Sequence, residues 1–114
     1  EAGLPVWDFD ISMGSKQGWD SADPEGWWVR REENLWITRL FEDPTFAARV
    51  SARWDELKPA FSAIAAALPA RDAAMDRVRT VDGARWGWIP EPEDSGAWLS
   101  AWLTQRIAWL DAHL

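Results

Sequence analysis

The chain has 114 residues, of which 47% are apolar, with a formal net charge of −7 and no cysteine. This length permits one domain with a real core, expected over residues 1–114. The acidic charge argues against nucleic acid and against an anionic membrane as partners. No apolar run approaches the roughly 18 residues of a membrane span. Without cysteine, the chain has neither a disulfide framework nor a thiolate metal site.

The first predicted element is a short strand over residues 6–11, where apolar and acidic residues alternate. Its apolar side chains would lie on one face and Asp8 and Asp10 on the other, because successive side chains of a strand point to opposite faces. Two carboxylates at this spacing can converge on a hard cation such as Mg²⁺ or Mn²⁺. They could equally be solvated, cap the next turn, or form the carboxylate pair of a compact glycoside hydrolase.

Residues 14–28 are rich in Gly, Asp, Ser and Pro and are predicted to form an irregular loop. The loop carries Trp19, Trp27 and Trp28, in a chain with eleven tryptophans and no tyrosine. Exposed indoles on a polar loop can stack on a sugar, so a small carbohydrate-binding module is one hypothesis. The alternative is that the three rings pack the loop onto a helical core.

Helices are predicted in the rest of the chain from the spacing of its apolar residues. The first covers residues 32–41, and the second begins at Pro44, where Asp43 is a suitable N-cap. We expect Pro59 to kink or split the second helix and Pro69 to end it, because proline removes a hydrogen-bond donor from the helix interior.

A short charged helix over residues 71–79, a turn at Asp82-Gly83 and a last helix capped by Asp94-Ser95 complete the prediction. His113 is interpreted as a surface residue at the end of the last helix. Five tryptophans lie on the apolar stripes of predicted helices and are expected to be core residues: Trp36, Trp54, Trp98, Trp102 and Trp109.

The chain opens with the segment Trp7-Asp8-Phe9-Asp10-x-x-x-Gly14. Four further motifs follow it in order: Trp36-x-x-Arg39-Leu40-Phe41-x-Asp43-Pro44-x-Phe46, Arg53-Trp54-x-Glu56-Leu57, Arg85-Trp86-Gly87 and Trp102-Leu103-x-x-Arg106-x-x-Trp109-Leu110-Asp111. This order of motifs resembles the C-terminal half of the kinase domain in the spore-coat CotH family of atypical protein kinases. The first segment is similar to that family's metal-binding segment, which stands where ordinary kinases carry Asp-Phe-Gly.

This resemblance implies a mainly α-helical fold, with a short N-terminal β segment and a Trp-rich loop packed on about four helices, as in the C-lobe of a kinase. It also implies a Mg²⁺-dependent phosphotransferase in which Asp8, with Asp10 as co-ligand, holds Mg²⁺ or Mn²⁺. ATP would bind only if a nucleotide-binding lobe is supplied, since no residue here matches that lobe's lysine or the catalytic aspartate.

The same resemblance leads us to expect a fragment or a reduced form of a larger CotH-like kinase domain, inactive on its own. Its partners would be the missing N-terminal kinase portion or a protein substrate, with carbohydrate as the alternative. Neither nucleic acid nor a membrane is expected as a partner. The implied location is extracellular or at the cell surface, with a cytoplasmic one left open.

Overall fold

The computed structural model describes residues 12–14, 18, 20–27, 34–89 and 91–114. Within these ranges the chain is mainly helical and has no strand, which confirms the predicted fold class. The predicted strand over residues 6–11 lies outside the described residues. The elements are η1 (Asp20–Ala22), α1 (Leu35–Phe41), α2 (Pro44–Ala74), α3 (Asp76–Trp86), η3 (Pro92–Asp94) and α4 (Gly96–His113), where η marks a 3₁₀ helix.

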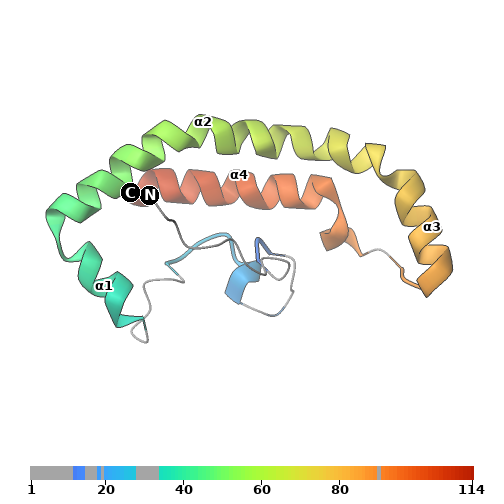
Figure 1. Ribbon diagram of the computed structural model, residues 1–114, viewed down its shortest axis with the longest axis horizontal. Coiled ribbons are helices and arrows are strands. Elements are labelled where there is room, and N and C mark those ends of the chain that lie inside the picture. The colour runs from blue at the N-terminus through green and yellow to red at the C-terminus, as the bar shows by residue number, and fades with distance from the viewer. Residues whose placement is uncertain (1–11, 15–17, 19, 28–33, 90) are drawn as a thin grey trace, which may run out of the picture.

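The body of the molecule is the antiparallel pair of α2 and α4, which lie side by side along α4 (Figure 1). Helices α1 and α3 turn away at the two ends of α2 (Figure 1). The described part of the N-terminal loop lies on the side of α4 opposite α2 (Figure 1). Helix α4 is therefore the central element, with α2 on one side and the loop on the other.

The starts of α2 and α4 confirm the predicted caps. The Asp43 carboxylate accepts a 2.8 Å hydrogen bond from the Thr45 backbone N–H, with Pro44 in the first helical position. At α4, the Ser95 hydroxyl accepts a 3.1 Å hydrogen bond from the Trp98 backbone N–H. Both caps satisfy amide groups that have no partner within the helix, so local sequence fixes both helix starts.

Helix α2 is not split at Pro59, and the prediction that Pro69 ends it was wrong, because the helix runs through both prolines to Ala74. Beyond Pro69 the helix is held by α4. A β-carbon on Gly96 would lie 2.7 Å from the Leu68 carbonyl oxygen and 2.5 Å from Asp72 Cβ. This close approach of two helices stabilises the turn that contains Pro69 and offsets its missing hydrogen bond.

The predicted bounds of the helix over residues 71–79 were wrong, and so was the predicted turn at Asp82-Gly83. Residues 71–74 are the last turn of α2, and Asp82 and Gly83 lie inside α3. Helix α3 ends one turn later at Gly87, which has a φ of +68° and donates its N–H to the Gly83 carbonyl at 2.8 Å. Helix α3 is thus ended by Gly87 in the left-handed conformation.

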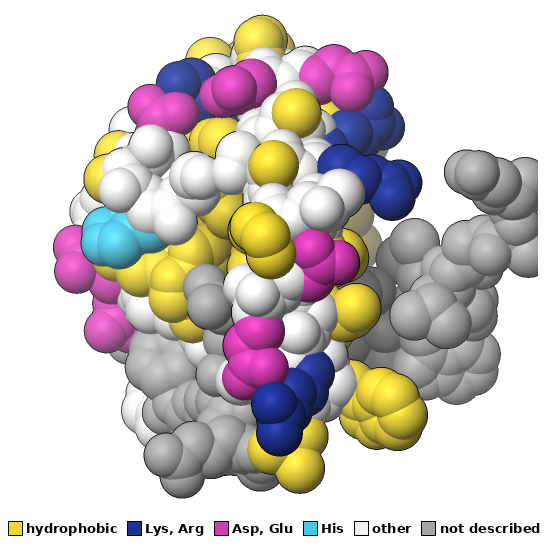
Figure 2. Space-filling view, turned by 90° about the vertical axis from the view of Figure 1, so that its left-hand side faces the viewer, with side chains coloured by type: hydrophobic (Ala, Val, Ile, Leu, Met, Phe, Trp, Pro, Cys, Tyr) yellow, Lys and Arg dark blue, Asp and Glu magenta, His cyan; other side chains and the backbone are white. Residues whose placement is uncertain are grey.

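The apolar core is thin, and much apolar surface is exposed. Ala65 is the one apolar residue buried among those described. Trp36, which we expected in the core, is 85% exposed because α1 turns away from α4, whereas Trp54 and the three tryptophans of α4 are half-buried. Apolar side chains also lie exposed between charged ones at the end of the molecule that carries α1 (Figure 2).

The total surface is large for the mass of the chain. It is 8997 Å² for 13.0 kDa, whereas a globular protein of this mass exposes about 6,300 Å². The most exposed large apolar residues lie on α1, on α3 and just after α3: Leu35, Trp36, Val78, Val81, Trp86 and Ile89. None of the described helices is long and apolar enough to cross a membrane.

Candidate functional site

The start of the N-terminal loop is seated on α4 through Gly14. This glycine is buried and has a φ of +81°. A β-carbon on it would lie 2.7 Å from both Cδ1 and Nε1 of Trp102 and would also collide with the Trp98 ring. Position 14 therefore requires glycine for two reasons: its backbone conformation is left-handed, and the two indoles leave no room for a side chain.

The second half of the loop is bound to the next turns of α4 by side-chain donors. Trp102 Nε1 donates a 2.9 Å hydrogen bond to the Ala22 carbonyl. Arg106 Nη1 donates to the Pro24 carbonyl at 2.9 Å and to the Gly26 carbonyl at 2.8 Å. Since these acceptors are all backbone carbonyls, the donors fix the path of the loop with little dependence on its side chains.

The loop is shaped locally to present those carbonyls. The Asp23 carboxylate accepts a 2.8 Å hydrogen bond from the Glu25 backbone N–H, which is the Asx-turn typical of an Asp-Pro sequence. Partial burial lowers the pKa of the Arg106 guanidinium, and the charge of nearby Asp23 opposes this effect. Arg106 stays protonated at neutral pH, so it remains a donor to the loop.

The described loop ends at a cluster of aromatic rings. Trp27 is half-buried, with its ring centroid 4.8 Å from that of Trp109 in an edge-to-face arrangement and 6.1 Å from that of Phe41. Trp27 therefore packs the end of the loop onto α4 and α1. Trp19 and Trp28 lie outside the described residues, so carbohydrate stacking on this loop stays a prediction.

These contacts form one stripe on α4, which we call the loop-binding stripe: Trp98, Trp102, Arg106 and Trp109. Their spacing of four, four and three residues places them on one face of the helix. The sequence assigned the three tryptophans to an apolar face, but it did not identify Arg106 as the residue that binds the loop. The family-like motif includes Arg106, but the motif does not show which groups it binds, because its acceptors are backbone carbonyls.

The predicted metal ligands, Asp8 and Asp10, lie outside the described residues. Among the residues that the structure does describe, no group of three or more His, Cys, Asp or Glu side chains could hold a metal ion.

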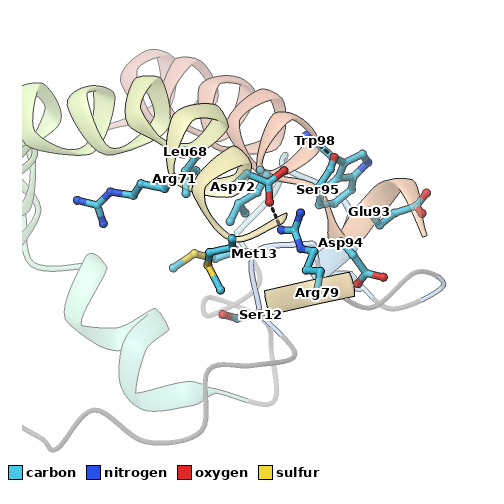
Figure 3. Close-up of a pocket in the computed structure, with 13 residues that line it drawn as sticks. Ser12, Met13, Leu68, Arg71, Asp72, Arg79, Glu93, Asp94, Ser95 and Trp98 are labelled. Atoms are coloured by element: carbon cyan, nitrogen blue, oxygen red, sulfur yellow. Dashed lines mark hydrogen bonds and ion pairs between the residues drawn. The ribbon is translucent and has the colours of Figure 1, made fainter. Parts of the chain in front are cut away.

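A pocket of about 470 Å³ opens near Gly14, between Met13, the end of α2, η3 and the start of α4 (Figure 3). Trp98 lines the pocket and also contacts Gly14, so the pocket and the loop share a wall. Met13 is 47% exposed and has a φ of +55°, the one positive value at a described non-glycine residue. Such strained backbone is found at functional sites more often than elsewhere.

The charges at this pocket do not favour a bare phosphate. Arg79 is paired with Asp72 across the corner between α2 and α3, and Arg71 extends away from this pair (Figure 3). Glu93 and Asp94 add negative charge on the side of η3. Among the described lining residues, no unpaired cation is therefore directed into the pocket.

Comparisons with known proteins point to one family. A family model described as "CotH kinase protein" matches residues 3–110 of the chain. No curated protein and no solved structure matches it.

Proposed function

The chain belongs to the CotH kinase family, and from this premise we propose that it is the helical, metal-holding part of a Mg²⁺-dependent phosphotransferase. Asp8 and Asp10 hold Mg²⁺ or Mn²⁺ in this proposal. Two carboxylates two residues apart form a donor set that suits a hard cation. When bound, such a cation would neutralise the charge on the phosphates of ATP.

The observation that carries the proposal is the seat of Gly14 against Trp98 and Trp102. A cation binds more tightly when its ligands are held in place before it arrives. Gly14 follows Asp10 by four residues, and the chain beyond it is fixed to α4 at Ala22, Pro24 and Gly26. Gly14, the nearest described glycine after the two aspartates, is therefore held in place on α4.

We further propose that the chain does not transfer phosphate by itself. Phosphoryl transfer depends on positioning and on electrostatic stabilisation, both of which need a nucleotide-binding lysine and a catalytic aspartate. By resemblance, neither has a counterpart among these 114 residues. The exposed apolar residues of α1 and α3 support the proposal that a further polypeptide covers these two helices. An extracellular or cell-surface location, by analogy with the family, is part of the same proposal.

Thermal melting with and without about 10 mM Mg²⁺ tests the metal site, because a cation that binds the folded state raises the melting temperature. We expect a rise for the wild type and none for Asp8→Asn. Asp55→Asn is the matched control, since it removes the same charge from an exposed position on α2. Equal shifts in all three proteins would mean general screening of the −7 charge and would reject the metal site.

A further inference from the structure

Helix α3 turns one side towards the rest of the molecule and the opposite side away from it. Arg79 and Gly83 are the two residues of α3 that are half-buried. Arg79 forms an ion pair with Asp72 of α2, and a β-carbon on Gly83 would lie 3.0 Å from the Trp88 carbonyl oxygen. Residues four apart share a helix face, so this pair marks the inner side of α3. The other side faces outward at the end of the molecule (Figure 1).

The outer side of α3 carries three residues at the spacing of contact positions in a coiled coil, which we call the α3 seam: Val78, Val81 and Arg85. Val78 is 61% exposed and Val81 is 62% exposed. The Arg85 guanidinium lies 5.0 Å from the centroid of the Trp86 ring, so its charged end is drawn off the seam while its aliphatic stem stays on it. A groove of about 360 Å³ runs along this side of the helix.

Opposite charges flank the α3 seam. Arg77 lies beside Val78 on one flank, and Asp82 lies beside Val81 on the other. Both side chains are exposed, and no ion pair between described residues involves either of them. In a parallel pair of helices, a residue on the first flank meets the residue five positions later on the second flank of the partner helix. Arg77 of one copy would therefore meet Asp82 of another.

We propose that the outer side of α3 is a dimer interface, on which a second copy of this chain lies parallel to the first. Two-fold symmetry then forms the pair of Arg77 with Asp82 twice. An antiparallel pair would bring each flank against the same flank of the other copy, and arginine would face arginine. The proposal identifies the polypeptide that covers α3 in the proposed function, and it depends on neither the metal site nor phosphoryl transfer.

The position of α3 leaves room for this arrangement. Helices α2 and α4 both lie on one side of α3, which forms the end of the molecule (Figure 1). A two-fold axis along the outer side of α3 sends the bodies of the two copies in opposite directions. The second copy can therefore reach the α3 seam without meeting α2 or α4 of the first.

The dimer should be weak, because two turns of helix bury less than the roughly 1,200 Å² of a standard interface. Arg85 weakens it further, since it brings two like charges near each other at the seam. Arg85→Leu should consequently lower the dissociation constant of the dimer at least about tenfold, by replacing that repulsion with apolar contact. An interface that used Arg85 to attract an acidic partner would respond in the opposite direction.

Sedimentation equilibrium between about 10 µM and about 1 mM, in buffer with EDTA, tests the proposal. We expect a reversible dimer for the wild type. Arg77→Asp and Asp82→Arg should each raise the dissociation constant about tenfold or more, since both attractions become repulsions. An equimolar mixture of the two variants restores both pairs and should dimerise like the wild type. The double variant that carries both substitutions should also do so.

Arg49→Asp and Asp55→Arg are the matched controls, because they make the same changes of charge at exposed positions of α2. Both should dimerise as the wild type does. The proposal is rejected if the wild type stays monomeric at about 1 mM, or if Arg77→Asp and Asp82→Arg dimerise as the wild type does. It is also rejected if neither the mixture nor the double variant dimerises, or if Arg85→Leu weakens the dimer. Far-UV circular dichroism checks that each variant is folded. Since EDTA is present throughout, failure of the dimer leaves the metal site untouched, and failure of the metal site leaves the dimer untouched.

Discussion

Gly14 and Trp102 are packed so closely that position 14 has no room for a side chain, because a β-carbon there would lie 2.7 Å from Trp102 Cδ1. The two residues are far apart in the sequence, yet this contact fixes the start of the described loop on α4. The seat is formed by helix α4, which also carries the donors to the rest of the loop. The path of the described loop residues therefore depends on α4 more than on any other described element.

Replacing Gly14 with Ala should destabilise the protein by about 2–4 kcal/mol, through the positive φ and the collision with the two indoles. Gly18→Ala is the matched control, because Gly18 has a nearly equal φ of +80° but nothing within 4 Å of its β-carbon position. Urea unfolding of both variants isolates the packing contribution. Equal losses of stability in the two variants would show that the contact of Gly14 with α4 does not contribute to stability.

Much of the fold could be predicted from local sequence, and the exceptions have identifiable causes. The caps at Asp43 and Ser95 depend on hydrogen bonds to amides two or three residues away, so the sequence shows them directly. The continuation of α2 through Pro69 depends on contact with Gly96, which is distant in sequence. Local rules for proline cannot include that contact.

The candidate site also has one part that the sequence predicts and one part that only the structure shows. Asp8 and Asp10 were proposed from their spacing and from the family resemblance, and they lie outside the described residues. The role of Arg106 became visible only in the structure, because its partners are the carbonyls of Pro24 and Gly26. Carbonyl groups occur at every position, so a sequence gives no sign of which ones a donor will find.

The tryptophans should differ in how much they contribute to the stability of the fold, although the sequence predicts the same core position for Trp36 and Trp109. Trp109→Ala should cost about 2–4 kcal/mol, since its ring contacts Trp27, lies under Arg106 and stacks on His113 at 4.1 Å. Trp36→Ala should change stability by less than about 0.5 kcal/mol, since Trp36 is 85% exposed. Thermal or urea unfolding distinguishes them. A large loss for Trp36→Ala would contradict the placement of α1.

Acid stability should depend on the ion pair between Lys58 and Asp111, whose Nζ and Oδ1 atoms are 2.5 Å apart. The hydrogen bond from Lys58 lowers the pKa of the Asp111 carboxyl below its usual 3.8. The unfolded chain therefore takes up the proton first as the pH falls. The stabilising effect is present above about pH 4 and is lost as the pH drops through the folded-state pKa.

Melting temperatures at about pH 7 and about pH 3 check this expectation. Asp111→Asn should lose less stability between the two pH values than the wild type does. Lys58→Met should behave similarly, because it removes the main cause of the shift. The effect should be small, since both side chains are partly exposed. A steeper pH dependence in Asp111→Asn would contradict the assignment.

The most direct test of the metal site is a titration of the ¹⁵N-labelled chain with substoichiometric Mn²⁺, followed by NMR. A paramagnetic ion broadens the signals of nuclei near it, so the experiment locates the cation without any assay of activity. If Asp8 and Asp10 hold the ion, the amides of residues 8–11 should broaden first and those of Ser12, Met13 and Gly14 next, and Asp8→Asn should remove the effect. Broadening centred on Glu93 and Asp94, or unchanged in Asp8→Asn, would contradict the account.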